Sequence, residues 1–244
     1  MSTQLRWVFL DLDNTLWDFD GNAQEALKVL FERHQLHLHS TYQVEQFIHL
    51  YQDVNQAYWS KYERGEVDKE TLRTRRFTDT FDLMGVPHAL QPDNVWQEYL
   101  DICPQMTRLM PGAQKCLELL SQKFKIGLLT NGFEQTQQIK LSSSGLGQWV
   151  DFMQSSERVG LAKPDSKFFE LALNSVQCSP EQAVYIGDNL KTDVWGGVGA
   201  GIDTYFYNPS KTKIPSNQFP DSIHFKGEAI DLLNWAEGIL ECGR

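Results

Sequence analysis

From Met110 onward the sequence alternates between helical and strand patterns, and this alternation restricts the fold more than any other feature. Stretches with helical periodicity lead in turn to four short apolar runs: KIGLLT, VDFMQSS, AVYIGD and DTYFYN. Strands joined by helices run parallel, and a parallel sheet is covered by helices on both faces. We therefore predict an α/β fold with a parallel sheet.

A further strand near the N-terminus is separated from this region by a long helical stretch. The run WVFL is apolar throughout, so it must join the same sheet to be buried. Between it and Met110, apolar residues recur at helical spacing in four segments, over residues 23–31, 47–58, 72–81 and 95–100. The sequence thus predicts an all-helical insert at residues 17–106 and a core built from residues 1–16 and 107–244.

Charge and composition exclude several classes of partner. The 32 acidic residues outnumber the 22 basic ones, giving a net charge of -10, which disfavours a nucleic-acid polymer or an anionic membrane. No apolar run approaches the roughly 20 residues of a membrane span. The four cysteines form no C-x-x-C pair and are expected to be reduced thiols, with Cys116 in the core. We expect a soluble, cytoplasmic protein.

Polar residues follow the predicted strands at the points where ligands bind to open parallel sheets. The first strand ends in Asp11 and Asp13, the second in Thr130-Asn131-Gly132, and a later one in Gly187-Asp188, with Asp193 five residues on; Lys163-Pro164 lies in a loop. Each piece alone has an ordinary structural explanation, as a turn, a helix start or a surface loop. Two carboxylates as close as Asp11 and Asp13 repel each other, however, and burying either is costly unless a positive or hydrogen-bonding group offsets it. Four such pieces in order predict a functional site.

The segments DLDNT, LLTNG, AKPD and GDNLKTD resemble, in this order, the four motifs of the haloacid dehalogenase superfamily of phosphotransferases. The resemblance implies a Rossmann-like core, and the helical insert resembles the C1 cap of that family. It further implies that Asp11 attacks phosphorus to form an aspartyl-phosphate. Asp13 would protonate the leaving oxygen and then activate water. Many members have Gly where this chain has Asn14, and Asn also tolerates turn conformations.

The resemblance also implies a set of binding residues. It assigns Mg²⁺ to three oxygen donors: the Asp11 carboxylate, the Asp13 backbone carbonyl and the Asp188 carboxylate. It assigns the phosphoryl oxygens to the Thr130 hydroxyl, the Asn131 backbone N–H and Lys163. Asp193 would orient Lys163 or a metal-bound water.

The wider chain is most similar to the pyrimidine 5'-nucleotidases of this superfamily, through TNGF and the aromatic segment YWSKYERG. We therefore expect a Mg²⁺-dependent phosphomonoesterase for small pyrimidine nucleoside monophosphates, in an oligomeric state that the sequence leaves open. Its candidate leaving-group contacts are aromatic: Trp17, Tyr58, Trp59, Tyr62 and Phe133. Tyr58, Trp59 and Tyr62 could instead belong to the core of the helical insert, at helical spacing.

Other classes of protein share parts of this pattern. A phosphatase or mutase for a small sugar phosphate or phosphoglycolate has the same core motifs. A dehalogenase needs neither a metal nor a leaving-group acid, so Asp13 and Asp188 argue against it. Receiver domains of signalling proteins also form an aspartyl-phosphate, but they lack a helical insert of this size. A catalytically dead scaffold is disfavoured because no motif residue is missing.

Overall fold

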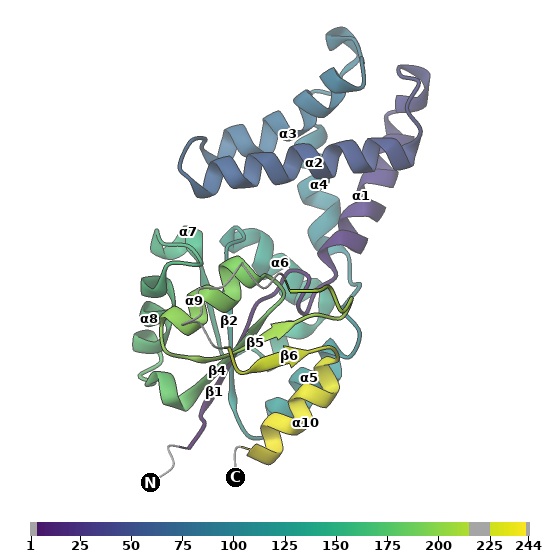
Figure 1. Ribbon diagram of the computed structural model, residues 1–244. Coiled ribbons are helices and arrows are strands. Elements are labelled where there is room, and N and C mark those ends of the chain that lie inside the picture. The colour runs from purple at the N-terminus through teal and green to yellow at the C-terminus, as the bar shows by residue number, and fades with distance from the viewer. Residues whose placement is uncertain (1–3, 215–224, 243–244) are drawn as a thin grey trace. The chain divides into compact units, whose positions relative to one another are not determined.

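The computed structural model describes residues 4–214 and 225–242 and divides into two compact units (Figure 1). The first, here called the sheet unit, comprises Met1–Phe19 and Thr107–Arg244; the second, the helical unit, comprises Asp20–Met106. The helical unit thus begins three residues later than the sequence indicates. Trp17 consequently belongs to the sheet unit.

The sheet unit contains a six-stranded parallel sheet in the order β3-β2-β1-β4-β5-β6, which confirms the predicted fold class. Its strands are β1 (Trp7–Leu10), β2 (Lys125–Thr130), β3 (Phe152–Ser155), β4 (Ala183–Gly187), β5 (Asp203–Tyr207) and β6 (Gly227–Ala229). The sequence predicts the first five. β6 has only the three residues GEA, without a strand pattern, and is defined by its pairing with β5.

The sheet unit also contains helices. They are α5 (Ala113–Leu120), α6 (Glu134–Ser144), α7 (Ser156–Val159), α8 (Ser166–Ser175), α9 (Trp195–Gly199) and α10 (Leu232–Cys242), with a π-helical turn at Leu190–Val194. The sequence analysis missed the single turn α7, and it also missed α10. The buried residues of α10, namely Leu232, Trp235, Ala236 and Ile239, have the helical spacing i, i+3, i+4, i+7 that would have revealed it.

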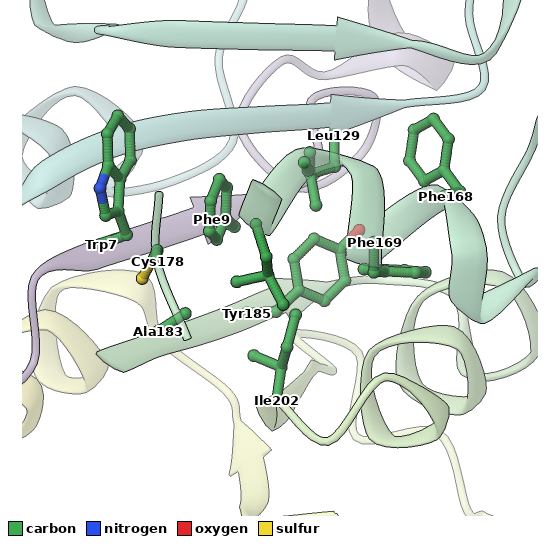
Figure 2. Close-up of a cluster of buried hydrophobic side chains, with 11 residues drawn as sticks. Trp7, Phe9, Leu129, Phe168, Phe169, Cys178, Ala183, Tyr185 and Ile202 are labelled. Atoms are coloured by element: carbon green, nitrogen blue, oxygen red, sulfur yellow. The ribbon is translucent and has the colours of Figure 1, made fainter. Parts of the chain in front are cut away.

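The core on one face of the sheet positions the strand ends where the acids lie (Figure 2). Phe9 on β1 lies beside Tyr185 on β4, and the ring of Phe169 from α8 meets that of Tyr185 edge-on at 5.1 Å. All four residues of β1 are buried, because helices cover both faces of the sheet. Cys116 is buried as well, as expected.

The helical unit has a separate core. Its helices are α1 (Phe19–Arg33), α2 (Val44–Glu63), α3 (Lys69–Leu83) and α4 (Val95–Ile102). The first residue of α1, Phe19, ends the N-terminal segment of the sheet unit. Aromatic rings fill its interior, contributed by Phe31, Phe47, Tyr51, Phe77, Phe81 and Tyr99. Within residues 4–214 and 225–242, no helix combines the length and the apolar character needed to cross a bilayer.

Candidate active site

The strand order brings three of the predicted residues to neighbouring strand ends. β1 lies between β2 and β4, with Leu10 opposite both Leu128 and Ile186. Asp11 follows β1, Thr130 ends β2 and Asp188 follows β4. After β1 the next strand, β2, lies toward one edge of the sheet, and after β4 the next strand, β5, lies toward the other edge. Such a switch point leaves a crevice at the carboxyl ends of the strands of a parallel sheet.

Lys163 lies at the centre of this arrangement. Its Nζ is 2.6 Å from Asp11 Oδ1, 2.6 Å from Asp193 Oδ1 and 3.0 Å from the Tyr185 hydroxyl oxygen. Burial lowers the pKa of Lys163, but its ion pairs with Asp11 and Asp193 outweigh burial and raise the pKa above its usual range. The ammonium group therefore stays charged and fixed beside the Asp11 carboxylate.

Asp193 is held in place by the chain around it. The Tyr185 hydroxyl donates to Asp193 Oδ1 at 2.6 Å, and the Asn189 backbone N–H donates to Asp193 Oδ2 at 3.0 Å. A Cβ atom at Gly187 would lie 2.4 Å from Asp193 Cγ, so only glycine at the end of β4 lets Asp193 approach. Tyr185 was not predicted as a site residue. Its ring belongs to the core cluster while its hydroxyl reaches the site.

Asn131 is tied to Lys163 by two hydrogen bonds. Its Nδ2 donates to the Lys163 backbone carbonyl at 3.0 Å, and its Oδ1 accepts from the Lys163 backbone N–H at 2.9 Å. This amide pairing fixes the loop that carries Lys163 to the end of β2. The sequence did not reveal that the Asn131 side chain holds this loop. The role predicted for Asn131 concerns its backbone N–H, as a donor to a phosphoryl oxygen.

Three carboxylates face one another in the part of the chain that the structure describes. Ligand oxygens of Asp11, Asp188 and Asp193 all lie within 4.8 Å of one another. Burial, together with the charges of Asp193 and Asp13, raises the pKa of Asp11 to about 7 despite the opposing effect of Lys163. Burial, followed by the charges of Asp11 and Asp193, raises the pKa of Asp188 well above its ordinary value. A cation would relieve this repulsion.

The donor set fits a hard divalent cation such as Mg²⁺, which prefers carboxylate and carbonyl oxygens. Both oxygens of Asp193 already accept hydrogen bonds. Among the described residues, Asp188 Oδ1 accepts a 3.2 Å hydrogen bond from the Thr15 hydroxyl, and Asp11 uses Oδ1 for Lys163. The carboxylates of Asp11 and Asp188 therefore retain the most lone pairs for a metal.

The hydroxyl of Thr130 is oriented as a donor. Its Oγ1 accepts hydrogen bonds from the Gly132 backbone N–H at 3.0 Å and from Gln137 Nε2 at 2.6 Å. A hydroxyl oxygen accepts at most two hydrogen bonds, so the Thr130 proton must point elsewhere. Thr130 is thus a preorganised donor at the end of β2, as a phosphoryl oxygen would require.

Asp13 has two partners on α6 that the sequence analysis missed. Lys140 Nζ is 2.5 Å from Asp13 Oδ1, and Gln137 Nε2 is 2.9 Å from Asp13 Oδ2. The buried positions of α6 are Gln137, Lys140 and Leu141, so polar side chains lie on its inward face. An inward helix face with two polar residues departs from the apolar stripe expected of such a helix.

The five aromatic candidates lie in different surroundings. Trp17 is fully buried in the sheet unit, with Lys140 Nζ over its ring at 4.4 Å. Phe133, also buried, directly precedes α6. In the helical unit, the Tyr58 hydroxyl donates to Asp79 Oδ2 at 2.6 Å, and the rings of Trp59 and Tyr62 meet edge-on at 5.8 Å. Trp17 and Phe133 thus lie in the sheet unit, and the substrate contacts expected of all five residues stay predictions.

Known proteins are similar to this chain in sequence. The family model for haloacid dehalogenase-like hydrolases matches residues 5–201. The pyrimidine 5'-nucleotidase YjjG of Escherichia coli is 30% identical over 216 residues, which cover 88% of this chain and 91% of that protein. The pyrimidine 5'-nucleotidase PynA of Streptococcus pneumoniae is 30% identical over 84% of each chain.

A solved structure agrees with the whole fold. The crystal structure of the HAD-hydrolase YfnB of Bacillus subtilis, which contains magnesium, matches 97% of this chain and 99% of that one. The TM-score is 0.81 at 26% sequence identity. On the family match, the sheet topology and the relatives together, the chain belongs to the haloacid dehalogenase-like hydrolases and is an enzyme of their phosphatase type.

Proposed function

We propose that this enzyme is a Mg²⁺-dependent phosphomonoesterase that acts through an aspartyl-phosphate on Asp11, with pyrimidine nucleoside 5'-monophosphates as its substrates. The observation that carries the chemistry is the buried contact of Lys163 with Asp11 at 2.6 Å. A phosphate dianion repels a carboxylate nucleophile, and a fixed cation beside that carboxylate reduces the repulsion.

In the first step one oxygen of Asp11 attacks phosphorus, and the bond from phosphorus to the leaving oxygen breaks. The Thr130 hydroxyl, the Asn131 backbone N–H and Lys163 bind the phosphoryl oxygens as charge shifts in the transition state. Asp13 gives a proton to the leaving oxygen. It then takes a proton from the water that hydrolyses the aspartyl-phosphate.

The Asp11 and Asp188 carboxylates and the Asp13 backbone carbonyl would hold Mg²⁺, which when bound supplies positive charge to the phosphoryl group. Burial, followed by the charges of neighbouring acids, raises the pKa values of Asp11 and Asp188, and this cost of holding the acids together supports the assignment. Asp193 does not contact the phosphoryl group but fixes Lys163, whose Nζ lies 2.6 Å from Asp193 Oδ1.

Removal of divalent ions tests the metal assignment. We expect phosphate release to stop in excess chelator and to return when Mg²⁺ is added, because the acids around Asp11 would otherwise repel the phosphate. The measurement is release of inorganic phosphate from one ester across a titration of Mg²⁺ against chelator. Undiminished turnover in excess chelator would contradict the assignment.

We further propose that the helical unit is a cap that selects the leaving group. Asp11, Lys163 and Asp188 handle only the phosphoryl group and the metal, so they cannot distinguish one ester from another. The two nucleotidase relatives, together with TNGF and the aromatic segment, support a pyrimidine base as the group selected. The candidate contacts are Trp17, Phe133, Tyr58, Trp59 and Tyr62, since aromatic side chains can stack on a planar base.

A substrate panel tests this choice. We expect UMP, dUMP and dTMP to be hydrolysed with higher kcat/KM than AMP, GMP, glucose 6-phosphate and phosphoglycolate, because a purine is bulkier and a sugar lacks a stacking face. Steady-state kinetics on all seven esters at one Mg²⁺ concentration gives the comparison. Equal or higher values for glucose 6-phosphate or phosphoglycolate would refute the nucleotidase assignment and leave the phosphatase chemistry intact.

A further inference from the structure

Two residues of α6 bind the two oxygens of Asp13 separately. Lys140 Nζ contacts Oδ1 at 2.5 Å, and Gln137 Nε2 contacts Oδ2 at 2.9 Å. Gln137 and Lys140 are three positions apart, so they lie on the same face of the helix. Because both oxygens accept hydrogen bonds, the Asp13 carboxylate cannot rotate freely about its Cβ–Cγ bond.

Lys140 is itself held in place. Its side chain is only 4% exposed, and its Nζ lies 4.4 Å from the ring centroid of Trp17 and 5.3 Å from that of Phe19. The negative faces of aromatic rings attract an ammonium group. Asp13 supplies the carboxylate on its other side. Lys140 is therefore enclosed by groups of the sheet unit, and its charge is directed at Asp13.

Gln137 links Asp13 to the neighbouring strand. Its Nε2 also donates to Thr130 Oγ1 at 2.6 Å, so both hydrogens of one amide nitrogen are used. A Cβ atom at Gly132 would lie 2.1 Å from this nitrogen, and the glycine of TNGF leaves the space that Gln137 occupies. The Gln137 amide thus fixes the position of Asp13, the proposed proton donor, relative to Thr130, a proposed ligand of the phosphoryl group.

From this geometry we propose that Lys140, together with Gln137, is a positioning residue that orients the Asp13 carboxyl group for proton transfer to the leaving oxygen. The proposal rests on the proposed function, in which Asp13 is the acid and base. Proton transfer requires alignment to within a fraction of an ångström, and a small misplacement costs a large factor in rate. Lys140 acts through Asp13, since it is buried and its Nζ is directed away from solvent.

The dependence of rate on the leaving group separates this role from a structural one. An alkyl ester such as UMP needs a proton on its leaving oxygen. The leaving group of 2,4-dinitrophenyl phosphate, 2,4-dinitrophenolate, is a stable anion and departs without one. We expect Lys140→Met to lower kcat/KM for UMP by ~10–100-fold and that for 2,4-dinitrophenyl phosphate by less than ~3-fold. Lys140→Arg, which keeps the charge, should recover most of the UMP activity.

Matched variants complete the experiment. Lys125 pairs with Asp151 at 2.6 Å on the surface, so Lys125→Met removes an exposed lysine–aspartate ion pair and should change neither ester appreciably. Asp13→Asn should show the same preference for the dinitrophenyl ester, and adding Lys140→Met to it should have little further effect. If Lys140→Met does not fold, as judged by thermal unfolding, Lys140→Gln replaces it.

The outcomes distinguish the two proposals. If Asp13→Asn spares the dinitrophenyl ester and Lys140→Met slows both esters equally, the positioning role is wrong while the proposed function stands. If Asp13→Asn itself slows both esters equally, the acid role of Asp13 is wrong and the proposed function fails at that step.

Discussion

Asp11→Asn is expected to abolish phosphate release, with a loss of ~10⁴-fold or more, the scale on which removal of a covalent nucleophile acts. An amide nitrogen or oxygen is a far weaker nucleophile than a carboxylate oxygen. The substitution conserves shape, and the amide oxygen can still accept the 2.6 Å hydrogen bond from Lys163. The loss would therefore report chemistry rather than a collapsed site.

Two measurements check this expectation. Release of phosphate from UMP gives the rate, and acid quenching of the enzyme with a phosphorus-labelled ester shows whether label stays on the protein. The wild type should carry acid-stable label on a peptide that includes Asp11, and the variant should carry none. Turnover near the wild-type rate in Asp11→Asn, on any phosphate ester, would refute the mechanism.

Asp165→Asn is a suitable control for this substitution. Asp165 caps α8 by accepting from the Lys167 backbone N–H at 3.0 Å, and asparagine caps a helix equally well. It lies two residues from Lys163 in the same loop and outside the three-carboxylate cluster. Activity close to that of the wild type is expected, so a loss specific to Asp11→Asn cannot be ascribed to an Asp-to-Asn change in this region.

The parts of the site that the sequence reveals are those next to strand ends. An apolar strand has a recognisable pattern, and the edge of a parallel sheet determines where the next residue lies. Asp11, Thr130 and Asp188 are predictable for this reason, and the structure brings them to adjacent strands. Their proposed roles depend on the chemistry of the motifs, which the experiments above test.

The parts that the sequence does not reveal depend on packing between distant elements. Asp13 and Lys140 are 127 positions apart, and their contact depends on which face of α6 turns inward. A helix with a weak apolar stripe gives little information about that orientation. Trp17 shows the same difficulty, because its place after the first motif does not reveal that its ring packs against Lys140.

Tyr185 illustrates a third case. Its position in a buried strand predicts a core residue, and its ring does lie in the core cluster of Figure 2. Only the length of the tyrosine side chain carries the hydroxyl to Asp193 and Lys163. Buried tyrosines usually find a hydrogen-bond partner, but strand periodicity does not say which one.

Lys163→Met is expected to have the largest effect on stability, a loss of about 3–5 kcal/mol in the free energy of unfolding, together with loss of activity. The side chains of Lys163 and Asp193 are nearly inaccessible, and Asp11 is 9% exposed. Removing the ammonium group leaves both carboxylates buried without their cation. Breaking a buried ion pair in this way costs more than the pair itself contributes, because the remaining charge has lost its hydration.

The measurement is urea unfolding at neutral pH in the presence of chelator, so that a bound divalent ion does not contribute to stability. Lys125→Met again provides the control, since its pair with Asp151 is exposed and should contribute about 1 kcal/mol or less. Adding Asp193→Asn to Lys163→Met removes one of the two uncompensated charges and should restore part of the loss. If Lys163→Met unfolds at the same urea concentration as Lys125→Met, the charge of Lys163 does not hold the carboxylates together. The electrostatic account of the nucleophile would then have to be abandoned.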